Sequence, residues 1–419
     1  MSAFQETHRR EYGELFCSIP WIESDQASRA ALERESLLTE IGPAASACRG
    51  AKIHAGELAP GCRRCTEGQW SCLFINGRCN AGCFFCPSEQ HETGVPTTNT
   101  LTFASPRDYV AYLERFGFSG ASLSGGEPFL TFDRTLLFVE RIKRRFGSQV
   151  HLWLYTNGLL HTEPKLARLR DAGLDEIRFN ILAGDYRLDK LQKAVGVIPT
   201  VTVEIPAVPE DEPRLRDLLP VLRDVGLDHL NLHQIRLTPF NLPHLTRRGY
   251  RFADGPKVTV PDSELTALRL IRFSLRKQIG MAINYCSFIY KHRYQAWAAR
   301  RRWGQQVLKP GEALTEAGYI RSITQGDDGQ AARARYFSAL VRSRPSFYAP
   351  FREVELGSRM SLFIERHPAS GEIELPREWA RSWNATGDDP GVDREALRRE
   401  MPEQIRPYEL MAEGLAPYL

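Results

Sequence analysis

Short apolar segments alternate with amphipathic stretches between residues 71 and 286, and this pattern constrains the fold more than any other feature of the sequence. Repeated strand-then-helix units build a parallel sheet, because each helix returns the chain to the edge where the next strand begins. The expected strands are 72–76, 121–124, 150–155, 176–181, 200–205 and 230–235, with 281–285 as a candidate seventh. The fold class is therefore α/β, with a partial (β/α)6 TIM-like barrel.

The segments on either side of these repeats have different patterns. Residues 1–60 contain good helix formers and are expected to be an N-terminal helical extension. Residues 61–300 are assigned to the barrel together with a pair of cysteines that precedes its first strand. Residues 301–419 are expected to form a C-terminal appendage of mixed α+β structure.

Composition limits where the protein works and what it binds. The 55 basic and 51 acidic residues give a net charge of only +4, which argues against a nucleic-acid partner. No signal peptide and no run long enough to span a bilayer is evident, so we expect a cytoplasmic protein without a membrane partner. In a reducing compartment the nine cysteines are expected to be metal ligands rather than disulfides.

Three cysteines follow the first expected strand, at positions 79, 83 and 86. A [4Fe–4S] cube normally takes four thiolates, so a loop that offers three leaves one iron free to bind a small molecule. Structural zinc is the alternative, but such sites usually use four ligands in two CxxC pairs. The count and spacing therefore favour an iron–sulfur cluster held by Cys79, Cys83 and Cys86.

Further polar motifs follow the next three strands. The turn Ser124-Gly125-Gly126-Glu127-Pro128 follows the second strand, Thr156-Asn157-Gly158 follows the third, and Asn180 ends the fourth. In βα barrels the reactive groups lie at the carboxyl ends of the strands. These motifs are therefore expected to meet the cysteine loop at one rim.

The three-cysteine loop and the Gly-Gly-Glu-Pro turn together resemble the radical S-adenosylmethionine (SAM) superfamily. The resemblance implies that the amino and carboxylate groups of SAM bind the fourth iron. It also implies that Phe85 lies beside the adenine, that Gly125 and Gly126 allow close approach, and that Glu127 accepts a hydrogen bond from the SAM amino group. The remaining expected SAM contacts are Pro128, Thr156, Asn157, Arg178 and Asn180.

Residues 60–300 resemble, more specifically, a family of radical SAM proteins related to pyruvate-formate-lyase-activating enzymes. The shared elements are a GCxxC pair at residues 61–65 and the sequence Asn284-Tyr285-Cys286-Ser287. Phe85 departs from the commoner tyrosine, and Cys72 is an addition. The resemblance implies reductive cleavage of SAM to a 5′-deoxyadenosyl radical, with an electron donor such as flavodoxin or ferredoxin.

The upstream cysteines suggest a second metal site. Cys62 and Cys65 have CxxC spacing, and Cys72 and Cys286 are the expected additional ligands, with Cys48 as another candidate. The site would hold a second iron–sulfur cluster or a mononuclear iron or zinc ion. A redox-active or inert pair of thiols is the alternative.

The substrate is expected to be small and polar, because polar residues follow the later strands. The expected contacts are His233, Gln234, Arg236, Asn284 and Tyr285. Two alternatives remain open: a glycyl-radical activase acting on a partner protein, and SAM cleavage that transfers a 3-amino-3-carboxypropyl group. A cysteine-rich scaffold is disfavoured by the weak net charge and by the Gly-Gly-Glu turn.

Overall fold

The computed structural model describes residues 3–48, 51–98, 101–305, 312–314, 320–325, 351–355 and 360–365. The chain divides into two compact units. One comprises Tyr12–Gln295, and the other comprises Met1–Glu11 and Ala296–Leu419. None of the described helices combines the length and the apolar character needed to cross a bilayer.

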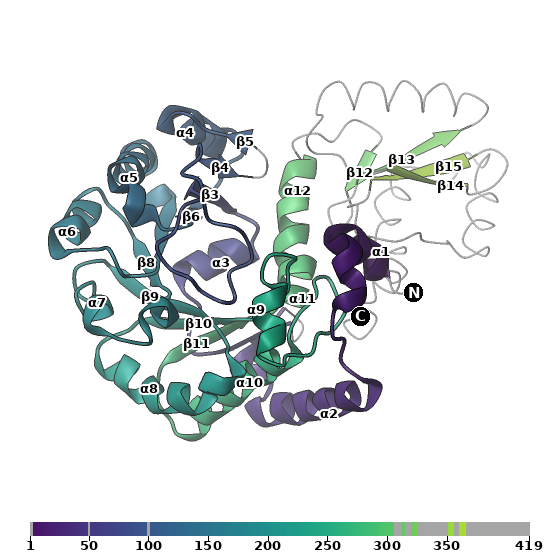
Figure 1. Cartoon of the computed structure of the whole chain (residues 1–419). Coiled ribbons are helices and arrows are strands. Elements are labelled where there is room, and N and C mark those ends of the chain that lie inside the picture. The colour runs from purple at the N-terminus through teal and green to yellow at the C-terminus, as the bar shows by residue number, and fades with distance from the viewer. Residues whose placement is uncertain are drawn as a thin grey trace. The chain divides into compact units, whose positions relative to one another are not determined.

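Parallel strands form the central part of the larger unit (Figure 1). Their order in the sheet is β3, β6, β7, β8, β9, β10, β11, so each new strand after β3 is added next to the previous one. The bounds are Trp70–Asn76, Gly120–Gly125, His151–Thr156, Glu176–Phe179, Thr200–Pro206, His229–His233 and Ala282–Cys286. All six main expected strands and the candidate seventh are present, which confirms the α/β fold class with an open, partial barrel.

Short strands extend the sheet at both edges. Antiparallel β2 (Lys52–Ala55) pairs with β11, and β1 (Ser46–Ala47) pairs with β2. At the other edge β4 (Thr97–Thr98) pairs with β3, and β5 (Leu101–Thr102) pairs with β4. The segment expected to be wholly helical, residues 1–60, therefore supplies two strands to the sheet.

Successive side chains of each strand point to opposite faces of the sheet. The outward side chains are apolar and fully buried under the helices; they include Leu123, Leu154, Ile177, Val203 and Leu232. Many inward positions carry buried polar side chains instead, alongside the aromatic Trp153; the polar ones include Ser122, Glu176, Thr202, Asn231 and Asn284. Barrel interiors are usually filled by branched apolar residues, so this polar inner face is a distinguishing feature.

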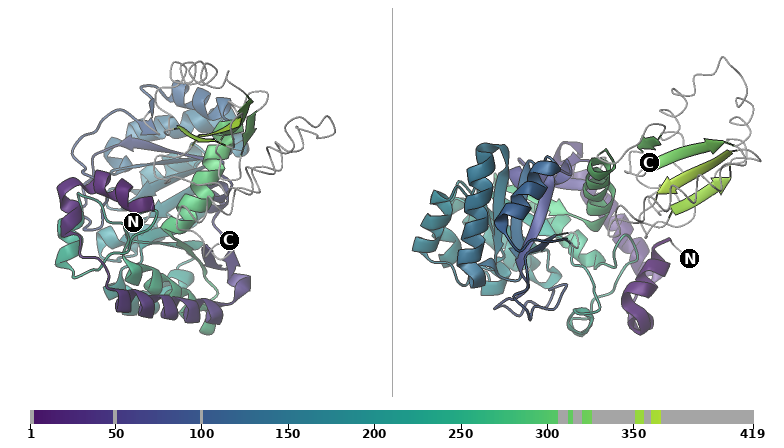
Figure 2. Two further views of the ribbon diagram at one scale, coloured as in Figure 1. Left: turned by 90° about the vertical axis from the view of Figure 1, so that its right-hand side faces the viewer. Right: turned by 90° about the horizontal axis from the view of Figure 1, so that it is seen from above.

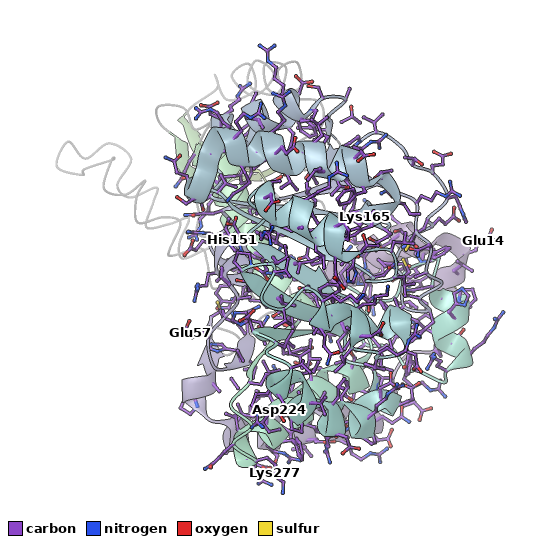
Figure 3. The ribbon with its side chains drawn as sticks, turned by 90° about the vertical axis from the view of Figure 1, so that its left-hand side faces the viewer. Glu14, Glu57, His151, Lys165, Asp224 and Lys277 are labelled. Atoms are coloured by element: carbon purple, nitrogen blue, oxygen red, sulfur yellow. The ribbon has the colours of Figure 1, made fainter. Side chains whose placement is uncertain are left out.

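Helices cover the outer face of the sheet (Figures 1 and 2). Arg34 of α2 pairs with Glu264 of α10, and Arg269 of α10 pairs with Glu33 of α2. Charged side chains such as Asp224 and Lys277 lie on the exposed surface of the outer helices (Figure 3). The α-helices of this unit are α2 (Ser24–Ile41), α3 (Pro60–Thr66), α4 (Pro106–Arg115), α5 (Phe132–Phe146), α6 (Glu163–Asp171), α7 (Asp189–Gln192), α8 (Glu212–Asp224), α9 (Leu242–Arg247), α10 (Pro261–Arg276) and α11 (Phe288–Tyr290).

Shorter turns of helix connect these elements. The 3₁₀ turns are η1 (Gly13–Ser18), η2 (Pro43–Ala45), η3 (Pro128–Thr131), η4 (Gly147–Gln149), η5 (Ile181–Gly184) and η6 (Pro209–Asp211), and η7 (Lys291–Ala296) is a π-helix. Ser105 caps the start of α4, where its hydroxyl accepts a hydrogen bond from the backbone N–H of Asp108.

The smaller unit contains helices α1 (Ala3–Tyr12) and α12 (Trp297–Gln305) and an antiparallel sheet. Its strand order is β12 (Glu312–Leu314), β13 (Ile320–Gln325), β15 (Met360–Glu365), β14 (Phe351–Glu355). These strands belong to the expected C-terminal appendage, and the rest of that expectation falls on residues outside the described ones.

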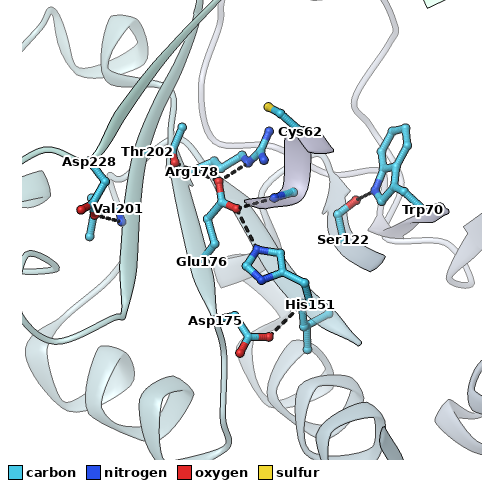
Figure 4. Close-up of polar contacts among 12 residues, drawn as sticks. Cys62, Trp70, Ser122, His151, Asp175, Glu176, Arg178, Val201, Thr202 and Asp228 are labelled. Carbon is cyan, nitrogen blue, oxygen red and sulfur yellow. Dashed lines mark hydrogen bonds and ion pairs between the residues drawn. The ribbon is translucent and has the colours of Figure 1, made fainter. Parts of the chain in front are cut away.

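Helix α3 lies against the polar inner face of the barrel (Figure 1). The backbone N–H of Gly61 donates to Glu176 on β8, and a Cβ at Gly61 would displace the buried Arg178 guanidinium from its place. The Glu176 carboxylate also accepts hydrogen bonds from Arg178 at 2.7 Å and from the His151 ring at 2.9 Å (Figure 4). Glu176 therefore connects α3, β7 and β8 at the centre of the barrel.

We expect Glu176→Gln to lower the free energy of unfolding by about 3 kcal/mol, because the change leaves the buried Arg178 charge with a weaker partner. Denaturant unfolding measures the loss. Glu57→Gln is the matched control, because the Glu57 carboxylate is 85% exposed and lies 3.5 Å from Arg63. The control should change stability by less than about 0.5 kcal/mol.

The pH dependence of the free energy of unfolding tests the same ion pair between Glu176 and Arg178. Burial alone would raise the pKa of Glu176, but the Arg178 charge and the hydrogen bond from His151 lower it from 4.5 to about 2. The stabilisation should therefore be complete above pH 4.5 and disappear as the pH falls to about 2. A difference in stability between wild type and Glu176→Gln that stays constant over this range would contradict the ion-pair account.

Candidate active site

Two loops meet at the carboxyl edge of β3 and β6. The backbone N–H of Gly126 donates to the carbonyl of Asn76 at 2.8 Å, and that of Glu127 donates to the carbonyl of Arg78 at 2.7 Å. Arg78 immediately precedes Cys79, so these bonds attach the Gly-Gly-Glu turn to the start of the three-cysteine loop.

Glycine is required at both positions of the turn. A Cβ at Gly125 would overlap the Asn76 carbonyl, and one at Gly126 would overlap the Arg78 carbonyl. Gly125 also has a φ of +118°, in the region that side chains disfavour. Both glycines keep part of their surface exposed, so they also leave backbone accessible at this edge.

Glu127 has a different role from the one expected. Its carboxylate is fully buried and accepts hydrogen bonds from the N–H of Asn157 at 2.7 Å, from the N–H of Phe129 at 3.0 Å and from the Thr156 hydroxyl at 2.9 Å. Burial raises the pKa of Glu127, and these donors oppose the rise. Glu127 and Thr156 therefore join the loops after β6 and β7, and their side chains are not available to SAM.

Pro128 is likewise buried and begins the turn η3, where its carbonyl accepts a hydrogen bond from the Thr135 hydroxyl at 2.8 Å. The expected SAM contact at Pro128 is therefore replaced by a structural role. Of the Gly-Gly-Glu-Pro turn, only the glycine backbone remains partly exposed at the barrel edge.

The three thiols of the loop are partly exposed and close enough to influence one another. Burial raises the pKa of Cys83 to about 11, and the neighbouring Cys79 and Cys86 contribute to the rise. N–H groups point at the sulfurs: Ala81 N lies 3.4 Å from Cys79 Sγ, and the Gln90 amide donates to Cys86 Sγ. Donors of this kind suit thiolates that ligate a cluster.

Asn157 and Asn180 flank the loop from β7 and β8. The Asn157 amide donates to Asn80 Oδ1 at 2.7 Å and lies 3.6 Å from Cys79 Sγ, and its own oxygen accepts from Leu159. Asn180 Nδ2 lies 3.8 Å from Cys83 Sγ. Asn180 Oδ1 is buried without a hydrogen-bond partner among the described residues, so this acceptor is left for a ligand.

Phe85 and His233 lie together at the edge, with ring centres 6.4 Å apart. The backbone carbonyl of Phe85 accepts a hydrogen bond from the side-chain amide of Asn241. The same amide group also donates to the carbonyl of Arg236, and its oxygen accepts from the N–H of Thr238. Burial, with the nearby Lys291 charge, lowers the pKa of His233 to about 4, so this ring is neutral at physiological pH.

Arg178 does not reach the edge. Its guanidinium is 3% exposed and pairs with Glu176 and Glu204, each at 2.7 Å. The expected contact of Arg178 with SAM is thus replaced by a structural ion-pair network beneath the site. Sequence alone could not show this, because it does not reveal that Glu204 on the next strand faces the same guanidinium as Glu176.

The expected substrate contacts separate into two groups. His233 and Arg236 are partly exposed, whereas Gln234, Asn284 and Tyr285 are buried. Gln234 donates to Thr259 and accepts from the N–H of Phe288, and Asn284 contacts Asn231 and Cys62 inside the barrel. Tyr285 lies on the opposite face of β11 from Asn284. Gln234 and Asn284 therefore form bonds within the chain, and the contact of these three residues with substrate stays a prediction.

The structure separates the cysteines expected at the second metal site into two groups. Cys62, Cys65 and Cys286 interact with one buried cation, Lys52, whereas Cys72 is beside Ser122 and interacts with Glu204 and Arg178. Among the residues that the structure describes, no three His, Cys, Asp or Glu side chains are close enough to hold a single metal ion. The sequence analysis did not identify Lys52, whose signal is a lysine among Ala51, Ile53 and Ala55.

The residues present fit a cluster with SAM bound to it. Three partly exposed thiols with N–H donors, an accessible glycine backbone and one unpartnered acceptor converge on the same rim. The thiols would hold the cluster, and the glycine backbone and Asn180 would face the polar end of SAM.

Residues 73–205 match the family described as the radical SAM superfamily. The chain is 29% identical over 276 residues to a protein of Methanocaldococcus jannaschii named "Putative glycyl-radical enzyme activating enzyme MJ0021", and this match covers 63% of the chain and 72% of the relative. It is 35% identical over 125 residues to a GTP 3′,8-cyclase of Lactiplantibacillus plantarum, covering 29% of the chain and 35% of that enzyme.

Solved structures with weaker similarity were also found. Methylornithine synthase (PylB) has a TM-score of 0.37 at 14% identity, over 60% of this chain and 81% of that one. SuiB of Streptococcus suis bound to S-adenosylmethionine has a TM-score of 0.36 at 14% identity, over 51% of this chain and 49% of that one.

We expect Gly126→Ala to reduce the iron and sulfide bound per chain and to lower stability by about 1–3 kcal/mol, because the added methyl group forces the turn away from the cysteine loop. Gly82→Ala is the matched control within the loop, because a Cβ there meets nothing within 4 Å. Iron and sulfide analysis of anaerobically purified protein measures the effect. Equal iron in the two variants would show that the attachment of the turn to the loop is dispensable.

Proposed function

Because residues 73–205 form a domain of the radical SAM superfamily, whose enzymes use a [4Fe–4S] cluster and SAM, we propose that this chain cleaves SAM reductively to a 5′-deoxyadenosyl radical and modifies a small polar substrate. When bound, the cluster supplies the electron that breaks a carbon–sulfur bond of SAM. The observation that carries the proposal is the convergence of the three-thiol loop, the glycine backbone and Asn180 at one rim.

In this proposal the chain positions SAM more than it reacts with it. Cys79, Cys83 and Cys86 hold the cluster, and the partly exposed backbone of Gly125 and Gly126 lies against the amino end of SAM. Asn180 Oδ1 accepts a hydrogen bond from SAM, which satisfies a buried acceptor that has no partner in the described residues. The ring of Phe85 provides an apolar surface for the adenine.

A polar substrate is favoured by the groups that remain accessible near this rim. His233 and Arg236 are partly exposed, and they are two of the five residues expected to contact substrate. A neutral His233 ring can donate and accept hydrogen bonds, and Arg236 provides a positive charge. An acidic or hydroxylated small molecule matches this pair.

A glycyl-radical activase is the second candidate, and the name of the Methanocaldococcus jannaschii relative favours it. In that case the hydrogen would be taken from a glycine of a partner protein. Anaerobic incubation with SAM, dithionite and a glycyl-radical enzyme would then give a glycyl-radical signal in the electron paramagnetic resonance (EPR) spectrum. Transfer of a 3-amino-3-carboxypropyl group would release 5′-methylthioadenosine instead of 5′-deoxyadenosine.

We expect Cys83→Ala to abolish 5′-deoxyadenosine formation from SAM and dithionite, because the loop then offers only two thiolates. Liquid chromatography of the products measures the loss. Cys17→Ala is the control, since Cys17 is exposed and belongs to no thiol group described above. Continued formation of 5′-deoxyadenosine by the Cys83 variant would refute the assignment of the cluster ligands.

We expect Asn180→Leu to raise the KM for SAM about tenfold at unchanged iron content, because one hydrogen bond is lost at constant volume. Asn157→Leu is the contrasting variant, because its amide is already used by Asn80 and Leu159. That change should lower iron content and leave the KM of the loaded fraction near the wild-type value. The reverse pattern would assign the SAM contact to Asn157.

A further inference from the structure

A second group of thiols lies inside the barrel, on the inner side of helix α3. Cys62 and Cys65 are three residues apart on α3 and therefore share one face of the helix. Cys286 is at the end of β11, and its side chain has the same inward parity as Asn284. All three interact electrostatically with Lys52, on the neighbouring strand β2.

The surroundings of Cys62 suit a negatively charged sulfur. Its Sγ lies 3.3 Å from Asn231 Nδ2 and 3.8 Å from Asn284 Nδ2, so two amide groups donate to one buried sulfur. Burial raises the pKa of the Cys62 thiol, and the positive charges of Arg178 and Lys52 oppose this rise. A neutral thiol is a weak acceptor and gains little from such donors, whereas a thiolate bound to metal gains from each of them.

Lys52 provides an independent reason for negative charge at this place. Its side chain is 1% exposed, and its Nζ lies 3.9 Å from Cys286 Sγ and 4.2 Å from the centre of the Tyr290 ring. The groups that interact electrostatically with the Lys52 ammonium are the thiols of Cys286, Cys62 and Cys65, followed by the Glu204 carboxylate. That carboxylate already accepts hydrogen bonds from Arg178 and Asn231. Burying a charged group costs free energy unless an opposite charge compensates it. Thiolates formed from these cysteines would compensate the charge of Lys52.

A fourth thiol is near the same cation. Cys48 interacts electrostatically with Lys52. The Tyr290 hydroxyl interacts electrostatically with Cys65, Cys286 and Cys48. Cys48 also has a left-handed backbone with φ of 53°, an uncommon conformation for a residue with a side chain. Cys72 lies outside this group, beside Ser122.

We propose that Cys48, Cys62, Cys65 and Cys286 bind a second iron–sulfur cluster inside the barrel, with Lys52 as its counter-cation. On binding, the four thiols release their protons to solvent and become thiolate ligands. Among the described residues no three His, Cys, Asp or Glu side chains are grouped as ligands of a single ion, and this holds for Cys79, Cys83 and Cys86 as well. The proposal of a cluster therefore stands on the four thiols around Lys52, which match the four thiolates that a cube normally takes.

The test is iron and sulfide analysis of anaerobically purified full-length protein. Wild type should bind about eight iron and eight sulfide per chain, and the triple variant Cys79→Ala, Cys83→Ala, Cys86→Ala should retain about four of each. The double variant Cys62→Ser, Cys65→Ser should also retain about four, together with the change of its EPR spectrum on adding SAM. Cys72→Ser is the matched control and should equal wild type.

Two results would overturn the proposal: a triple variant that binds no iron or sulfide, or wild type that holds zinc at the upstream cysteines. The triple variant decides the question even where the Cys62 and Cys65 changes prevent folding, because its three cysteines lie in the partly exposed loop. Lys52→Met supplies a second readout. Removal of the positive charge should shift the reduction potential of the inner cluster to a more negative value, and an unchanged potential would show that Lys52 does not face it.

Discussion

Two backbone hydrogen bonds hold the proposed active site together: Gly126 to the carbonyl of Asn76, and Glu127 to the carbonyl of Arg78. They attach the turn after β6 to the first residues of the cysteine loop. The buried Glu127 carboxylate then extends the same attachment to β7 through Asn157 and Thr156. Three loops are thereby fixed at one edge of the sheet, and the positions of the thiols and of Asn157 follow from that attachment.

The polar interior of the barrel is the second unusual feature. Glu176, Arg178 and Glu204 form a buried charged network across three strands, and helix α3 lies on it through the Gly61 contact. A network of this kind is costly unless each charge is compensated, so it fixes α3 in one position. The same helix carries Cys62 and Cys65, and their placement beside Lys52 therefore depends on the network.

The sequence was sufficient to predict the parallel strands and the rim on which the motifs meet, because these follow from local pattern and from barrel topology. It was not sufficient to assign side-chain partners. Glu127 and Arg178 were expected at SAM, and both are used by the protein itself, through partners that include Thr156 and Glu204 on neighbouring strands. Strand β2 was also missed, because four residues at an antiparallel edge carry too little pattern.

The most direct test of the account is electron-nuclear double resonance on the reduced protein with SAM labelled at its amino nitrogen. Cys79, Cys83 and Cys86 leave one iron for a small ligand, so the label should couple magnetically to the cluster, and the coupling should vanish in Cys83→Ala. A well-reduced wild-type cluster that shows no coupling to the labelled nitrogen would contradict the claim that SAM binds this iron.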